Sequence, residues 1–350
     1  MRVLSARLGV VAAVILAATA TLTACSSTDD KDIVTLVTHE SFAISDDAKK
    51  AFEDSSGITL KILRSGDAGT AINQAILTKG NPQGDVFYGL DNTHASRALE
   101  ENVFTPYEAK DLKGVNSQFH IDDSHQLTPI DFGDVCVNFD REYYQSNGQN
   151  PPQSFADLAK PEYKNQLVVQ NPATSSPGLA FMLGSVAEFG EDEWAQYWQQ
   201  LKDNEVEVVD GWEHAYYERF SGGANNGDKP LVVSYASSPP AEVGEGENPD
   251  QAPTGVVPGT CFRQVEYAGL LDGAKNADNG RKLIDFLISQ KFQEDLPENM
   301  YVYPVRDDVA LPPAFEKYAT PVDNPKTLAP STIADNREQW MKTWKSTVLG

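Results

Sequence analysis

Hydrophobic positions along the first third of the chain switch repeatedly between two spacings. Runs of Val, Ile and Leu at residues 33–37, 58–63 and 85–88 predict buried strands. The segments between them, residues 46–54 and the stretch around Ile72, place apolar side chains at helical spacing. An alternation of strand and helix is typical of a parallel sheet covered by helices. This part of the chain is therefore predicted to be an α/β domain.

Two longer extended runs, residues 129–138 and 259–267, interrupt this alternation. The segment between them has its own strands and helices, including a helix that begins near Pro177. We interpret the two runs as crossings between two lobes, one formed by residues 32–130 plus 262–350 and the other by residues 131–261. Ligands commonly bind between such lobes, and closure of the lobes would enclose them.

Two strands of the second lobe lead into an aromatic residue. Residues 206–209 are followed by Trp212, and residues 231–235 end at Tyr235. In open α/β sheets the ligand crevice lies beyond the carboxyl ends of the strands. An aromatic face at that position can hold a cation or a heteroaromatic ring. Trp212 and Tyr235 are therefore predicted to line the cleft; the alternative is that they are ordinary core or rim residues.

The N-terminus has the features of an export signal. Arg2 and Arg7 precede an apolar, Ala-rich run that ends in Leu22-Thr23-Ala24-Cys25. This ending resembles the bacterial lipobox, which implies removal of residues 1–24 and attachment of lipid to Cys25. Residues 25–31 then form a polar tether. The prediction is a protein held on the extracytoplasmic face of the cell membrane; the alternative is plain secretion with an incidental cysteine.

The charge of the mature chain is strongly negative. Loss of Arg2 and Arg7 reduces the 28 basic side chains to 26, against 51 acidic ones, a net charge of −25. Such a surface repels nucleic acid and attracts cationic small molecules.

Two cysteines, Cys136 and Cys261, remain beyond Cys25. Leftover thiols in an exported protein are more often paired than free, and these two lie on the two predicted crossings. We predict a disulfide between them. Their spacing argues against a metal site.

Signatures of catalysis are missing from the sequence. It contains no Gly-x-Ser-x-Gly elbow, no His-Glu-x-x-His, no phosphate-binding P-loop and no Gly-x-Gly-x-x-Gly. The five histidines show no metal-ligand spacing. The adjacent tyrosines at 143–144 and 216–217 could suggest an iron site, but neighbouring residues point apart on a strand or helix. We predict a protein with no catalytic residues, cofactor or metal.

Several short stretches, in order from about residue 33 to the end, together resemble the thiamine-binding periplasmic proteins of bacterial ABC importers. The stretches are Ser41-Phe42-Ala43, Gly89-Leu90-Asp91-Asn92, Pro152-Gln153-Ser154, Asn171-Pro172-Ala173-Thr174-Ser175-Ser176-Pro177-Gly178, Gly211-Trp212-Glu213-His214-Ala215-Tyr216, Val233-Ser234-Tyr235-Ala236-Ser237-Ser238-Pro239, Gln264-Val265-Glu266, Tyr303-Pro304-Val305 and Leu311-Pro312-Pro313-Ala314-Phe315-Glu316-Lys317. The resemblance implies a two-lobed type II solute-binding fold. It also implies a monomeric receptor that delivers thiamine, or thiamine phosphates, to a membrane permease.

The residue chemistry adds further candidate ligand contacts. Ser175 and Ser176 precede Pro177, so Ser176 is predicted to cap a helix whose first N–H groups face a hydroxyl or phosphate. Asp67 either meets a ligand amine or caps the helix that follows it. Glu266, on the return crossing, lies under the cleft or makes a buried hinge hydrogen bond.

The sequence departs from the family pattern at three further candidate positions. His39 stands where the family has a strand-end Tyr, Ala68 stands where it has a Gly after Asp67, and Tyr301 is the nearest aromatic residue to a family Trp. With fewer aromatic side chains around the ligand, the cleft could accept a related cationic heterocycle.

Two kinds of rival function remain open. The first is a receptor for another solute, such as a polyamine or ferric iron. The second is a thiamine-degrading enzyme on the same fold, which would need a nucleophilic cysteine in the cleft.

Overall fold

The computed structural model describes residues 32–225, 227–244, 246–319 and 322–350. These residues belong to one compact unit. The predicted signal peptide, Cys25 and the tether lie outside the described residues.

Ten strands in the described part of the chain form one sheet, in the order β2-β1-β3-β9-β5-β8-β6-β7, with β10 paired to β5 and β4 paired to β9. Their bounds are β1 (Ile33–Thr38), β2 (Thr59–Arg64), β3 (Val86–Asp91), β4 (Phe104–Thr105), β5 (Thr128–Asp140), β6 (Leu167–Gln170), β7 (Glu207–Val209), β8 (Leu231–Tyr235), β9 (Thr254–Leu271) and β10 (Tyr303–Pro304). The α-helices are α1 (Asp46–Ser56), α2 (Ala68–Leu77), α3 (Ala95–Glu100), α4 (Arg141–Ser146), α5 (Phe155–Leu158), α6 (Ser176–Asp203), α7 (Ala277–Leu287), α8 (Gln290–Gln293), α9 (Leu296–Asn299), α10 (Pro313–Tyr318) and α11 (Pro330–Trp344).

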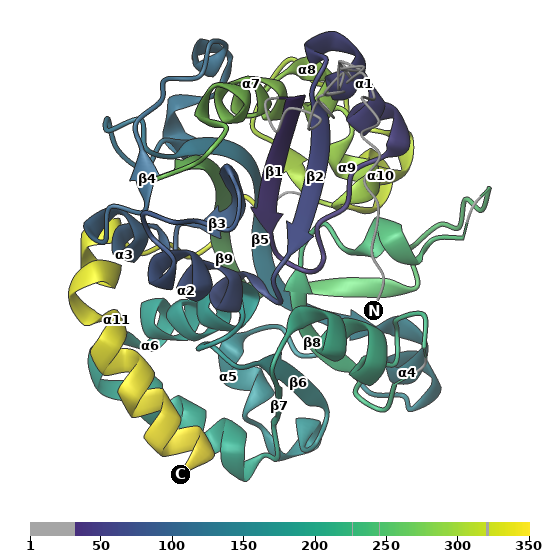
Figure 1. Cartoon of the computed structure of the whole chain (residues 1–350). Helices are drawn as coiled ribbons and strands as arrows, with labels where there is room; N and C mark the ends of the chain where they lie inside the picture. Colours follow the sequence, from purple (N-terminus) through teal and green to yellow (C-terminus); the bar gives the residue numbers. More distant parts are fainter. Residues whose placement is uncertain (1–31, 226, 245, 320–321) are drawn as a thin grey trace, which may run out of the picture. The chain divides into compact units, whose positions relative to one another are not determined.

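Parallel strands occupy the two ends of the sheet, and long antiparallel strands join them. β1 pairs in parallel with β2 and β3, and β6 pairs in parallel with β7 and β8. We call β1, β2 and β3 the first half of the sheet and β6, β7 and β8 the second half. β5 and β9 pair antiparallel with each other along most of their length and run between the two halves (Figure 1). The two extended runs expected from the sequence are the central parts of these strands.

Local sequence signals set where helices begin, end or break. The hydroxyl of Ser45 accepts the Ala48 N–H at the start of α1, and Gly57 ends that helix with a positive φ of 70°. The helix predicted near Pro177 is the start of α6, which consists of two helical segments separated by a break at Gly190. Gly190 has a φ of 74°, a backbone conformation that glycine adopts readily.

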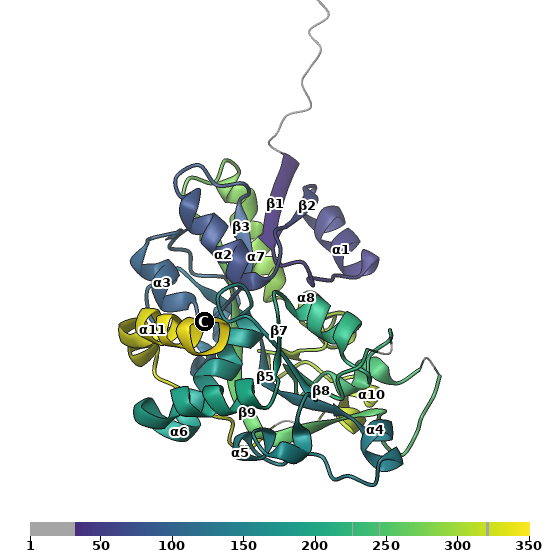
Figure 2. The same ribbon diagram turned by 90° about the horizontal axis from the view of Figure 1, so that it is seen from below.

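Each half of the sheet packs its own apolar core. The strands of the first half share a core with α7 and α8, and those of the second half pack on α6. Trp340 and Trp344 of the C-terminal helix α11 join the α6 core, and Trp344 packs edge-on against Trp198 at a ring distance of 5.5 Å. Figure 2 shows α11 lying beside α3 and α6, so this helix contacts both halves.

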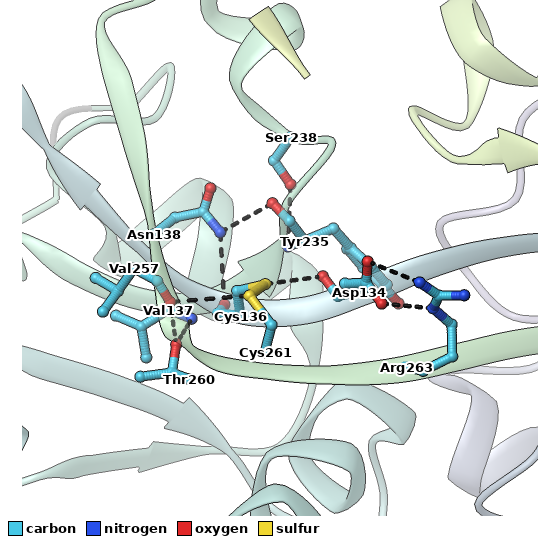
Figure 3. The surroundings of a disulfide bond; sticks show 10 residues. All are labelled: Asp134, Cys136, Val137, Asn138, Tyr235, Ser238, Val257, Thr260, Cys261 and Arg263. Carbon is cyan, nitrogen blue, oxygen red and sulfur yellow. Dashed lines mark hydrogen bonds and ion pairs between the residues drawn. A yellow bond between two sulfur atoms is a disulfide. The ribbon is translucent and has the colours of Figure 1, made fainter. Parts of the chain in front are cut away.

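A disulfide joins Cys136 of β5 to Cys261 of β9 (Figure 3). It lies where the pairing of β5 and β9 shifts register, between Val135 and Val137. Thr260 fills the irregularity, because its hydroxyl accepts the Val137 N–H and donates to the Val257 carbonyl. The link therefore ties together the two strands that connect the halves.

None of the helices in the described ranges is both long and apolar enough to cross a bilayer.

Candidate functional site

A cavity of about 350 Å³ lies where the two halves of the sheet meet. Eight of the nine predicted ligand residues line it: His39, Asp67, Ala68, Ser176, Trp212, Tyr235, Glu266 and Tyr301. Ser175, the ninth, is fully buried beside Ser176 and is not part of the lining. These residues come from segments of both halves that are far apart in the sequence.

Stacking holds the indole of Trp212 in the cavity wall. Its ring lies 4.8 Å from that of Tyr216 with an interplanar angle of 17°, and Tyr217 meets it edge-on at 5.3 Å. The indole Nε1 donates to Ser234 Oγ at 3.0 Å. With its edge and plane held in this way, Trp212 presents a preformed aromatic surface.

Tyr235 is positioned by the strands beside it. Asn138 Nδ2 donates to the Tyr235 carbonyl at 3.0 Å, and the Tyr235 N–H donates to Ser238 Oγ at 3.2 Å (Figure 3). A Cβ atom on Gly133 of β5 would stand 3.0 Å from Tyr235 Cδ1, so the absence of a side chain there gives the ring its place. Burial raises the pKa of Tyr235 well above its ordinary value, so the phenol stays neutral.

Asp67 connects three segments at the cavity wall. Oδ1 accepts the Ala68 N–H at 2.6 Å and the Ser176 N–H at 3.3 Å, while Oδ2 accepts the Trp212 N–H at 2.9 Å. Burial raises the pKa of Asp67, and these hydrogen bonds act in the opposite direction. Asp67 is therefore the cap of α2, one of its two expected roles, and it also joins that helix to α6 and to Trp212.

The start of α6 differs from the prediction. Ser175, not Ser176, is the N-cap residue, and its side chain makes no capping hydrogen bond. Ser176 is the first helical residue because its hydroxyl donates to Asp91 Oδ2 on β3 and its N–H donates to Asp67. Contacts with distant residues therefore take the place of a local cap, and the Ser176 N–H already has Asp67 as its acceptor.

Asp91 is a buried charge with several donors. The Thr93 N–H and hydroxyl donate to Oδ1 at 3.1 and 2.7 Å, and His94 Nδ1 lies 3.2 Å from the same oxygen. Burial by itself would raise the pKa of Asp91, but the hydrogen bonds from His94, Ser176 and Thr93 outweigh it and lower the pKa.

Glu266 has carboxyl groups opposite it on both neighbouring strands. It pairs with Asp91 of β3 on one side and with Asp131 of β5 on the other. Burial raises the pKa of Glu266 well above its ordinary value, and the charges of Asp131, Asp91 and Asp67 act in the same direction. Burial also raises the pKa of Asp131, to about 7.

His39 and Tyr301 line the cavity on the side of the first half. A Cβ atom on Gly89, which has a φ of 95°, would lie only 2.3 Å from His39 Cδ2, so the ring depends on a glycine at that position. Burial lowers the pKa of His39 to about 4, helped by the charge of Arg64, so the imidazole is neutral at pH 7. Tyr301 has a φ of 53° and lines the cavity beside Met300.

Sequence reasoning missed part of the wall. Tyr216, Tyr217, Glu242 and Met300 also line the cavity. The pair Tyr216-Tyr217 directly follows the Trp212 turn in the sequence, and this proximity is the signal that could have identified it; nothing local marks Glu242 as a cavity residue. The wall contains the carboxyl groups of Asp67, Glu242 and Glu266, and no Lys or Arg appears among its described residues.

The cavity offers little chemistry beyond binding. Both cysteines in the described ranges are used in the disulfide, so neither supplies a nucleophile. Within the same ranges, no group of three or more His, Cys, Asp or Glu side chains is arranged to hold a metal ion.

The chain is similar to known bacterial binding proteins over most of its length. Residues 81–323 match the profile of the bacterial extracellular solute-binding proteins. The chain is 30% identical to the thiamine-binding periplasmic protein of Escherichia coli (strain K12) over 323 residues. These residues are 91% of this chain and 94% of the relative. The corresponding protein of Brucella suis is 28% identical over 320 residues, which are 90% of this chain and 91% of the relative.

The solved structures show the same fold. A periplasmic thiamin binding protein superposes with a TM-score of 0.78 at 28% identity, covering 90% of this chain and 96% of the other. A ferric binding protein from Campylobacter jejuni reaches a TM-score of 0.70 at 17% identity over 90% of this chain and 99% of the other, a likeness of fold alone. The fold is the two-lobed type II solute-binding fold, and the protein is a binding protein rather than an enzyme. The chain belongs to the bacterial extracellular solute-binding proteins, within the family of thiamine-binding periplasmic proteins.

Proposed function

We propose that this protein binds thiamine in the cavity and delivers it to the permease of an ABC importer. The observation that carries the proposal is the composition of the cavity wall. The wall combines three carboxyl groups with aromatic rings, and its described lining contains no basic side chain. The rings are those of Trp212, Tyr216, Tyr217, Tyr235 and Tyr301.

Thiamine matches such a wall because it combines a cationic thiazolium ring with a flat aminopyrimidine. An aromatic face attracts a cationic ring by about 0.5–2 kcal/mol per contact, depending on desolvation. Carboxyl groups in the same wall supply the opposite charge and accept hydrogen bonds from an amino group. The relatives named as thiamine-binding proteins support the same ligand.

Thiamine phosphates are the second candidate ligands. The start of α6 is the feature of the wall that suits a phosphate. However, the Ser176 N–H already donates to Asp67, and Pro177 has no N–H to offer. We therefore propose unphosphorylated thiamine as the preferred form.

We further propose that the mature protein is a monomer attached to the extracytoplasmic face of the cell membrane through lipid on Cys25. Its lobes would be residues 32–130 plus 262–350 and residues 131–261, closing over the ligand. The lipobox-like Leu22-Thr23-Ala24-Cys25 supports the anchor, and the two long strands β5 and β9 support the lobe boundaries.

Titration calorimetry of the mature protein with thiamine, spermidine and ferric citrate tests the ligand. The protein is first unfolded, dialysed and refolded to remove any bound solute. We expect saturable binding of thiamine and at least about tenfold weaker binding of spermidine, because an aliphatic polyamine cannot stack on Trp212. Tighter binding of spermidine or iron than of thiamine would refute the proposal.

A further inference from the structure

Glu266 of the cavity wall is one of a pair of buried carboxyl groups. Glu266 of β9 lines the cavity and is only 7% exposed, and Asp131 of β5, directly opposite in the sheet, is fully buried. Residues that are directly opposite on paired antiparallel strands point to the same face of the sheet. The two side chains are therefore neighbours because of the strand register.

Only one oxygen of each carboxyl group accepts a hydrogen bond from another residue. The Tyr88 hydroxyl donates to Asp131 Oδ2, and Gln264 Nε2 donates to Glu266 Oε1 at 3.2 Å. Asp131 Oδ1 and Glu266 Oε2 are buried without a donor from any other described residue. Because Asp131 and Glu266 lie directly opposite each other on paired strands and share one face of the sheet, these two oxygens belong to neighbouring side chains. A proton held between the two carboxyl groups would satisfy both oxygens, whereas two ionised carboxyl groups at adjacent buried positions would repel each other. The geometry therefore favours a pair that carries one shared proton.

The groups around the pair favour retention of this proton. Asp91 faces Glu266 from β3, Asp67 faces it from the start of α2, and the phenols of Tyr88 and Tyr235 lie beside it. His94 and Arg337 approach this region next to Asp91, and the His39 ring lies 6.3 Å from that of Tyr88. The charges closest to Glu266 are therefore negative, and a second negative charge on the pair is unfavourable until a cation arrives.

We propose that Glu266 is the counter-ion of the bound cation and that ligand binding expels the proton that Glu266 shares with Asp131. This inference rests on the proposed binding of thiamine. The proton leaves for the solvent, the charge of the pair changes from −1 to −2, and the +1 charge of the thiazolium compensates the added charge. Asp67 cannot take this role as readily, because N–H groups of the protein already occupy both its oxygens.

Calorimetry in buffers of different ionisation enthalpy at the same pH measures the number of protons released per thiamine bound. We expect the wild-type protein to release a substantial fraction of one proton near neutral pH. Glu266→Gln should bind thiamine at least about tenfold more weakly and release none. Asp210→Asn is the matched control, because this exposed carboxyl group near Trp212 does not line the cavity, and it should keep the wild-type release.

A second variant keeps the test decisive if Glu266→Gln fails to fold or bind. Asp131→Asn replaces the neighbouring carboxyl group with an amide whose N–H can donate to Glu266, which favours the ionised form of Glu266, so proton release should fall clearly below that of the wild type while binding persists. Protonation of thiamine itself is common to all these proteins and cancels in the comparison. Binding of thiamine without proton release, or equal release by wild type and both variants, would overturn the inference and leave the proposed function intact. Absence of thiamine binding to the wild type would instead refute the proposed function.

Discussion

Single residues at the cavity are held in place by contacts with other parts of the protein. Trp212 stacks on Tyr216 and donates from Nε1 to Ser234, while its own N–H donates to Asp67. The plane of the indole is therefore set before any ligand enters. Preorganisation of this kind lowers the entropic cost of binding.

Replacing Trp212 with Ala should weaken thiamine binding at least about tenfold, or ~1.4 kcal/mol, because a stacking face is lost. Trp212→Phe keeps a ring but not the hydrogen bond to Ser234, and it should retain most of the affinity. Calorimetric titration of both variants measures the effect. Unchanged affinity of Trp212→Ala would count against a stacking role.

The buried carboxyl group of Asp131 also affects stability. Burial raises its pKa to about 7 from the ordinary 3.8, so between these pH values the folded state binds more protons than the unfolded state. The free energy of unfolding then falls as the pH rises, by up to about 1.4 kcal/mol per pH unit for one proton. His39, whose pKa burial lowers to about 4, contributes a slope of opposite sign below its ordinary 6.5.

Asp131→Asn removes one of these slopes and leaves that of His39 in place. The free energy of unfolding of the variant, relative to wild type, should increase steadily from about pH 4 to about pH 7. Urea unfolding at a series of pH values measures this difference. A difference that stays constant over the range would show that Asp131 titrates normally in the folded protein.

At the scale of elements, the paired strands β5 and β9 organise the molecule. They carry the carboxyl pair, the glycine beneath Tyr235 and the disulfide. Cys261 shares β9 with the cavity residue Glu266, but neither cysteine is part of the lining. Their link therefore bears on stability rather than on recognition.

Removal of the disulfide with the double variant Cys136→Ala/Cys261→Ala should lower the free energy of unfolding by about 3–5 kcal/mol. The reason is that the link, which spans a sequence separation of 125 residues, restricts the unfolded chain. Chemical denaturation of the oxidised protein and the variant gives the difference, and thiamine affinity should be unchanged. A loss below about 1 kcal/mol would contradict the expected contribution.

At the scale of the whole molecule, two packed halves meet at the cavity and α11 contacts both of them. Its Trp340 and Trp344 pack into the core of α6, although the helix follows the first-half strands in the chain. The proposed closing motion of the lobes therefore has to accommodate this helix. The proposed lipid on Cys25 lies outside the described residues and concerns only where the receptor is held.

Cys25→Ser should move the protein from the membrane fraction to the soluble extracytoplasmic fraction, since it removes the proposed site of lipid attachment. Thiamine affinity should not change, because the cavity lies wholly within the later residues. Fractionation followed by immunoblotting of wild type and variant measures the distribution. Equal distribution of the two proteins would contradict the anchor.

Some features of the cavity were predictable from neighbouring residues in the chain. The Ser45 cap, the strands before Trp212 and Tyr235, and the extended runs that became β5 and β9 follow from hydrophobic spacing and capping chemistry. The type II fold followed from the resemblance of several short stretches to one family.

The sequence by itself determined the alternation of strands and helices, the aromatic strand ends and the acidic character of the chain, because these depend on composition and on residues a few positions apart. Only the tertiary structure decided that Ser176 donates to Asp91, 85 residues away, and that Glu266 meets Asp131. Such contacts depend on the register of paired strands and on the packing of distant segments. A local pattern contains no information about either. The sequence offered a position under the cleft as one of two roles for Glu266, but its pairing with Asp131 became visible only in the fold.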